Sequence, residues 1–94
     1  MKILWSPRAL EHLVAVRAYI ALDDSNAAER VAAKILLRVE SLALHPHMGR
    51  PGRVAGTREL VVPDTPYILP YRIHKSCVEM IAVFHGRQRW PELL

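Results

Sequence analysis

Residues 27–44 carry the clearest pattern in the sequence. Apolar side chains recur there with the 3.6-residue period of an α-helix, at Ala28, Val31, Ala32, Ile35, Val39 and Leu42. Asn26 and Glu29 have the spacing of a capping box at the start of this helix, and His45-Pro46 end it. The pattern predicts a helix that buries one face.

Three further apolar residues, Leu36, Leu37 and Leu44, lie outside the centre of that stripe. The helix is therefore apolar over more than one face. Two interpretations are open. The helix is wedged between a sheet and a second helix, or it offers a groove to a partner protein.

A second helix is expected earlier in the chain, over residues 7–22. Residues 2–5 before it resemble a short strand, and Ser6-Pro7 predicts the helix start, with Ser6 as N-cap and Pro7 at the first helical position. The expected core stripe of this helix consists of Leu10, Leu13, Val14 and Ile20.

The second half of the chain is expected to form strands. After a loop over residues 45–56, strand-like runs cover 57–62, 67–73 and 78–84. Pro70 cannot donate to a strand ladder, so it predicts an edge or a bulge. The last run is apolar on both faces, which predicts a central, buried strand.

This order of elements, β-α-α-β-β-β, predicts a single α+β domain over residues 1–94. A helical hairpin would pack on one face of a mainly antiparallel four-stranded sheet. An apolar fraction of 51% is sufficient for a core. No run of residues resembles a targeting segment or a membrane span, and the lone Cys77 cannot form an internal disulfide. We therefore expect a cytoplasmic protein without a membrane partner.

Positive charge is concentrated in the second half of the chain. The formal net charge is +4; residues 1–44 contribute +1 and residues 45–94 contribute +3, together with four of the five histidines. This distribution suits an anionic partner, although ordinary solubilising charge would produce a similar balance.

Several motifs, taken together and in order, resemble those of the RelE/ParE superfamily of toxins. They are Trp5-Ser6-Pro7 with Ala9, Tyr19-Ile20, Ala27-Ala28, Arg30-Val31, Leu42 ahead of Pro46, Gly49-Arg50-Pro51-Gly52-Arg53, Gly56-Thr57-Arg58-Glu59-Leu60, Tyr67-Ile68, Tyr71-Arg72, and Val83-Phe84-His85-Gly86-Arg87-Gln88 followed by Trp90-Pro91. The resemblance covers essentially the whole chain. It implies the growth-inhibiting toxin of a type II toxin–antitoxin (plasmid stabilisation) system.

The resemblance also implies partners. A cognate antitoxin would wrap the toxin with its C-terminal segment, and operator DNA would be bound only through that antitoxin. RelE-like members cut mRNA on the ribosome without a metal, whereas ParE-like members act on DNA gyrase without hydrolysis. A binding module of the same fold without toxicity is the third alternative.

Candidate residues for mRNA cleavage are His85, Arg58 and Glu59, which could exchange protons and stabilise a charged phosphate. Tyr67 stands where RNA-cutting relatives place an arginine, and Gly52 and Arg53 stand where some place a glutamate. These departures favour the ParE-like, non-hydrolytic interpretation, and whether the protein is an enzyme stays open.

Two surfaces are predicted. The target-binding surface consists of Arg50, Arg53, Arg72, Arg87, Arg89 and Trp90. The alternative is that these arginines scatter and pair with Glu59, Asp64, Glu79 and Glu92. The antitoxin-binding surface consists of Arg17, Leu36, Leu37, Arg38 and Leu44. No metal is expected, because His45, His47, His74 and His85 lack paired-ligand spacing. No nucleotide cofactor is expected, because no Gly-rich loop follows a strand.

Overall fold

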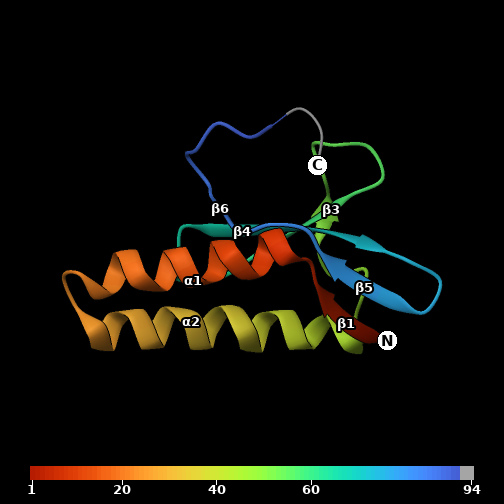
Figure 1. Ribbon diagram of the computed structural model, residues 1–94. Helices are drawn as coiled ribbons and strands as arrows, with labels where there is room; N and C mark the ends of the chain where they lie inside the picture. Colours follow the sequence, from red (N-terminus) through yellow and green to blue (C-terminus); the bar gives the residue numbers. More distant parts are fainter. Residues whose placement is uncertain (92–94) are drawn as a thin grey trace.

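The computed structural model describes residues 1–91, which form two layers (Figure 1). A hairpin of two helices covers one face of a sheet, and loops with the C-terminal segment lie over the other face. The elements in chain order are β1 (Lys2–Trp5), α1 (Pro7–Ala21), α2 (Ser25–Glu40), a 3₁₀ turn (Ser41–Ala43), β2 (Arg50–Pro51), β3 (Arg58–Val61), β4 (Tyr67–Ile73), β5 (Cys77–Met80) and β6 (Phe84–His85).

The sheet confirms the predicted α+β class and contains more strands than the four expected. Its order is β1-β5-β4-β3-β2, and β6 also pairs with β4. Only the β1–β5 pair is parallel among the described strands. Both helices and the strands β2, β3 and β4 lie between β1 and β5 in the sequence. The additional strands are two-residue segments: β2 lies within the expected loop, and β6 lies at the end of the expected last strand and extends one residue beyond it.

Helix α1 begins as predicted but turns a different face to the core. Ser6 Oγ accepts a hydrogen bond from Ala9 N at 3.0 Å, and Pro7 is the first helical residue. The prediction that Leu10 and Val14 are core residues is wrong: they are 49% and 68% exposed. The inward stripe, which has the same helical period, consists of Ala9, Leu13, Val16 and Ile20.

Helix α2 begins two residues earlier than predicted. Asp24, not Asn26, is the N-cap, and its Oδ1 accepts a hydrogen bond from Ala27 N at 3.0 Å. Glu29 does not close a capping box, because it bonds to Arg17 of α1. The predicted core stripe is confirmed, since Ala28, Ile35, Val39 and Leu42 are buried and Val31 and Ala32 are half-buried.

The predicted last strand is interrupted opposite Pro70. Strand β5 lies between β1 and β4, which confirms the central position expected for it. Ile81 N donates to Pro70 O at 3.0 Å, but Pro70 has no N–H to return the bond. The chain bulges at residues 81–83 and rejoins β4 as β6, which confirms the bulge that Pro70 predicts.

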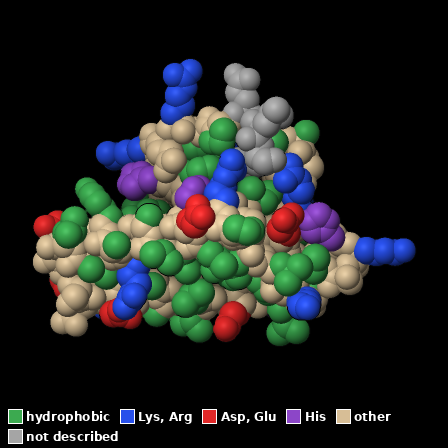
Figure 2. All heavy atoms as spheres, viewed as in Figure 1, with side chains coloured by type: hydrophobic (Ala, Val, Ile, Leu, Met, Phe, Trp, Pro, Cys, Tyr) green, Lys and Arg blue, Asp and Glu red, His purple; other side chains and the backbone are tan. Residues whose placement is uncertain are grey.

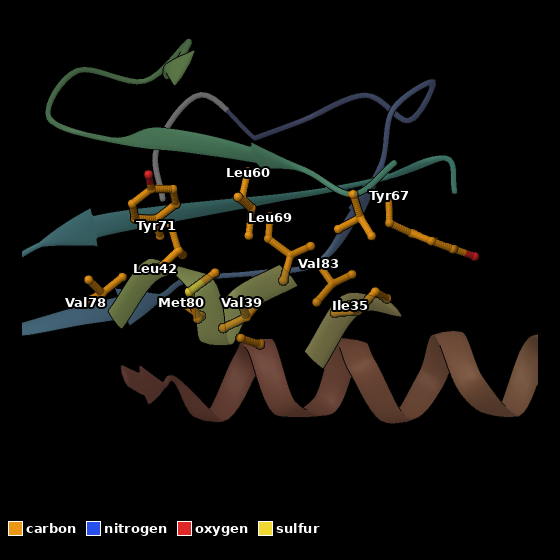
Figure 3. Packing of buried hydrophobic residues seen from close by; sticks show 12 residues of the cluster. Ile35, Val39, Leu42, Leu60, Tyr67, Leu69, Tyr71, Val78, Met80 and Val83 are labelled. Atoms are coloured by element: carbon orange, nitrogen blue, oxygen red, sulfur yellow. The ribbon is translucent and has the colours of Figure 1, made fainter. Parts of the chain in front are cut away.

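The core lies between helices and sheet, with Tyr71 at one end and Tyr67 at the other (Figure 3). Tyr71 is fully buried; its hydroxyl accepts from Gly49 N at 3.0 Å and donates to Pro46 O at 2.7 Å. A Cβ on Gly49 would lie 2.5 Å from this hydroxyl oxygen, so glycine permits the close approach. Tyr71 thereby fixes the loop that leads from α2 to the sheet.

Among residues 1–91, neither helix combines the length and the apolar character needed to cross a bilayer.

Candidate functional site

Glu59 is the centre of a charged cluster on the sheet face opposite the helices. Its neighbour Leu60 points into the core, so alternation along β3 directs Glu59 to the other face, where it is only 3% exposed. Glu59 Oε1 accepts from Arg50 Nε at 3.2 Å. Glu59 Oε2 accepts from Arg53 Nε at 3.0 Å and from Arg53 N at 2.8 Å.

These contacts determine the ionisation of Glu59. Burial raises the pKa of the carboxyl group, but the hydrogen bonds from Arg53 and Arg50 outweigh this effect and hold the pKa below its ordinary value. Glu59 is therefore a carboxylate at neutral pH, with both oxygens bonded. It was predicted as a proton acceptor, and here its acceptor sites are already used.

Arg53 connects this cluster to the C-terminal segment. Its guanidinium carbon lies 3.6 Å from the centroid of the Trp90 ring, and the Trp90 ring packs against Phe84 with centroids 4.8 Å apart. The segment after β6, which carries Arg87 and Arg89, passes over the same face of the sheet (Figure 1). Loop and tail thus form one surface.

Arg72 and Arg58, two further arginines that were predicted to belong to a site, have different surroundings. Arg72 follows core residue Tyr71 along β4, so it faces away from the helices, opposite Glu79 in register. Arg58 has a different role: its guanidinium donates to Gly49 O and His47 O and so ties the loop before β2. The predicted local pairing with acids occurs for Arg50 and Arg53 with Glu59, and Glu92 lies outside the described residues.

His85 lies at the end of β6 beside a hollow of about 280 Å³ bounded by Tyr19, Tyr67 and Gln88. The His85 and Tyr67 rings meet edge to face at 5.9 Å, and His85 Nδ1 accepts from Arg87 N at 3.1 Å. Burial, and then the neighbouring Tyr19, raise the pKa of Tyr67. The side chain of His85 thus shares none of these partners with Glu59 or Arg58.

The predicted antitoxin-binding residues belong to the helical layer: Arg17 lies on α1, Leu36, Leu37 and Arg38 on α2, and Leu44 directly after the 3₁₀ turn. Leu36, Leu37 and Leu44 are 43%, 67% and 83% exposed, so these three side chains are not packed between the sheet and α1. Arg17 bonds to Glu29, and Arg38 Nε donates to Val61 O at 3.2 Å. In Figure 2, hydrophobic side chains cover much of the helical layer, while several Lys and Arg side chains surround the C-terminal segment.

The model of the family described as ParE toxin of type II toxin–antitoxin system, parDE, matches residues 3–90. The chain belongs to this family. It is a ParE-family toxin of a type II toxin–antitoxin system.

Individual relatives of this ParE-family toxin cover nearly its whole length. The protein Y4kP of Sinorhizobium fredii is 50% identical over 93 residues, covering 99% of this chain and 96% of that protein. Toxin RelE2 of Caulobacter vibrioides is 36% identical over 85 residues, covering 90% and 94%. A chain of the chromosomal ParDE system of P. aeruginosa has the same fold, with a TM-score of 0.80 at 24% identity over 90% of this chain and 95% of that one.

Two features of this ParE-family toxin were missed from the sequence. His12 Nδ1 accepts a hydrogen bond from Val83 N, and Arg53 stacks on Trp90. A lone histidine on a helix, and an arginine in a Gly/Pro loop, carry no pattern that indicates such distant contacts. Among residues 1–91, no three or more His, Cys, Asp or Glu side chains gather as metal ligands.

Proposed function

We propose that this ParE-family toxin acts on DNA gyrase without hydrolytic chemistry and is neutralised by a cognate antitoxin. The observation that carries the proposal is the state of Glu59. Cleavage of RNA by its 2′-hydroxyl needs a free proton acceptor and a cation at one phosphate. Here Glu59 is buried and bonded to two arginines, and Arg58 is bonded to backbone carbonyls.

The target is tested by inducing the full-length toxin in cells that lack the antitoxin. DNA synthesis and protein synthesis are then pulse-labelled separately. We expect DNA synthesis to fall first, because a gyrase poison blocks the template before translation is affected. Early loss of translation with fragmented mRNA would overturn the gyrase proposal. Normal growth would support the non-toxic binding module.

The second candidate is RelE-like cleavage of mRNA on the ribosome. Two relatives carry the names RelE2 and RelE3, the latter 33% identical over 85 residues. His85 also occupies the position that matches a catalytic residue of RNA-cutting relatives, and Tyr67 lies against it. This candidate predicts that His85 exchanges a proton during cleavage.

Changing His85 to alanine distinguishes the two candidates. We expect growth inhibition to persist, because a non-hydrolytic toxin needs no proton exchange. A nuclease would lose about 10²–10⁴-fold in rate. The measurement is the inducer concentration that halves growth, with mRNA fragments followed in parallel. His45→Ala, at an exposed position, is the control, and loss of both toxicity and fragments only in His85→Ala would establish the nuclease.

The antitoxin would bind the outer surface of the helices. Leu37 and Arg38, together with Lys34, line a hollow of about 300 Å³ between α2 and the turn after β3. Leu37 is 67% exposed there. Apolar and basic side chains together suit an amphipathic segment with acidic residues. Operator DNA would be reached only through the antitoxin.

Changing Leu37 to glutamate should weaken antitoxin binding about tenfold or more, because it removes an apolar contact and adds a charge that opposes an acidic segment. The fold should be unaffected, since the side chain is largely in solvent. Titration calorimetry with the antitoxin measures the change. Ser76→Glu, in the exposed turn after β4, adds the same charge elsewhere. Equal affinity of both variants would place the antitoxin on another surface.

A further inference from the structure

The backbone between β5 and β6 leaves the strand ladder and requires other hydrogen-bond partners. Pro70 on β4 accepts from Ile81 N but has no N–H to donate. Residues 81–83 consequently bulge, although all three are buried. A buried backbone N–H or C=O without a partner is costly, so this segment depends on groups outside the ladder.

Residues at the start of α1 supply those partners. Ser6 N donates to Met80 O at 3.0 Å, and Ser6 Oγ donates to Ile81 O at 3.0 Å. One turn into the helix, His12 Nδ1 accepts from Val83 N at 3.1 Å. Ser6 and α1 therefore bind both ends of the bulge. The His12 side chain is the acceptor for the backbone N–H of Val83.

The hydrogen bond from Val83 N defines the protonation state and the tautomer of His12. Only a neutral imidazole with its proton on Nε2 can accept a hydrogen bond at Nδ1. Protonation would place an N–H against the Val83 N–H, so the bond would be replaced by repulsion. The ring also packs on Phe84 of β6, with centroids 5.5 Å apart.

We propose that His12 is a positioning residue: its neutral imidazole holds Val83, and thereby the place of His85 on β6, and a proton on Nδ1 releases this segment. Val83 and His85 both border the hollow that also contains Tyr67. A displacement of Val83 would be passed on to His85 over only two residues of the chain. Arg87 and Arg89 of the proposed target surface follow His85 along the chain. Any link from His12 to toxicity runs through them and rests on the proposed function.

The charges around His12 favour the neutral form. Burial lowers the pKa of His12 first, Arg8 lowers it further, and Glu11 partly opposes them. Both charged neighbours belong to α1. The C-terminal segment presents to the ring the Val83 backbone and Phe84, which do not titrate.

The next titratable groups make other contacts. His85 Nδ1 accepts a hydrogen bond from Arg87 N, and the Arg53 guanidinium stacks on Trp90, which packs against Phe84. The hydrogen bond to Val83 is therefore fully formed above the ordinary histidine value of 6.5 and is lost as pH falls through the lowered pKa of His12 in the folded chain.

Amide hydrogen exchange in the full-length chain tests this inference. After correction for the intrinsic pH dependence, protection of the Val83 amide should fall about tenfold between about pH 7.5 and about pH 4.5. Protection of the Gly49 amide, bonded to the Tyr71 hydroxyl, should change little. In His12→Asn, whose side-chain oxygen can replace Nδ1 but does not titrate, the Val83 response should disappear.

Further variants separate positioning from mere folding. His47→Asn, at an exposed histidine, should behave like the wild type. His12→Leu should lose Val83 protection at both pH values, whereas His12→Asn should restore it. Equal Val83 protection at both pH values in the wild type, or an unchanged pH response in His12→Asn, would overturn the inference. Because exchange is measured without a target, its result stands even if the proposed function fails.

Discussion

Changing Glu59 to glutamine should lower the free energy of unfolding by about 2 kcal/mol at neutral pH. The carboxylate is almost completely buried and accepts hydrogen bonds from Arg50, from the Arg53 side chain and from the Arg53 backbone. Glutamine preserves the shape but removes the charge and turns one oxygen into a donor that faces arginine. The arginines are half exposed and can regain water, which limits the loss. Denaturant unfolding measures it.

Glu59→Gln should also change how the free energy of unfolding depends on pH in the acid range. The pKa of Glu59 is lowered in the folded chain, so its contribution is complete above the ordinary value of 4.5 and is lost as pH falls through the folded value. Glu59→Gln should lack this part of the acid destabilisation. Glu29→Gln, which removes an exposed pair with Arg17, should cost less than about 0.5 kcal/mol. An equal loss of unfolding free energy in the two variants would show that the buried ion pairs of Glu59 stabilise the fold no more than an exposed pair does.

The elements with a repeating pattern were predictable from the sequence. The stripe from Ala28 to Leu42 specifies one buried face of α2, and Ser6-Pro7 specifies where α1 begins. The rotation of α1 was not predictable from period alone. Two overlapping apolar stripes fit the helix, and the bonds from Ser6 to Met80 and Ile81 fix which one faces the sheet. Those partners are more than 70 residues away in the sequence.

The sequence was sufficient to predict which types of residue form the candidate site. It was not sufficient to predict which of these residues contact one another. Arg50 and Arg53 were recognised as cations in a loop, yet their attachment to Glu59 depends on β2 forming beside β3. The Arg53–Trp90 stack requires the tail to fold back over the sheet. Such contacts result from tertiary packing, and no local periodicity in the sequence encodes them.

Reversing both tail charges, Arg87→Glu with Arg89→Glu, should abolish growth inhibition while leaving the fold intact. Both side chains are exposed, and the bond from Arg87 to His85 uses the backbone N–H, which the substitution retains. Reversal of basic residues at the edge of an interface with an anionic surface reduces association and adds repulsion. Growth after induction without antitoxin, together with thermal unfolding, measures the effect.

Arg53 is a less suitable position for this test. Glutamate there would lie beside the buried Glu59 and would remove the cation stacked on Trp90, so a loss of toxicity could follow from misfolding alone.

The matched control reverses two charges on the helical layer, Arg30→Glu with Lys34→Glu. Each double reversal removes two positive charges and adds two negative charges, so both variants bring the formal net charge from +4 to zero. Any effect of overall charge on encounter with the target is then the same in both. The helical variant should remain toxic, because the sheet face opposite the helices would meet the target. A folded tail variant that still arrests growth would show that the target binds elsewhere.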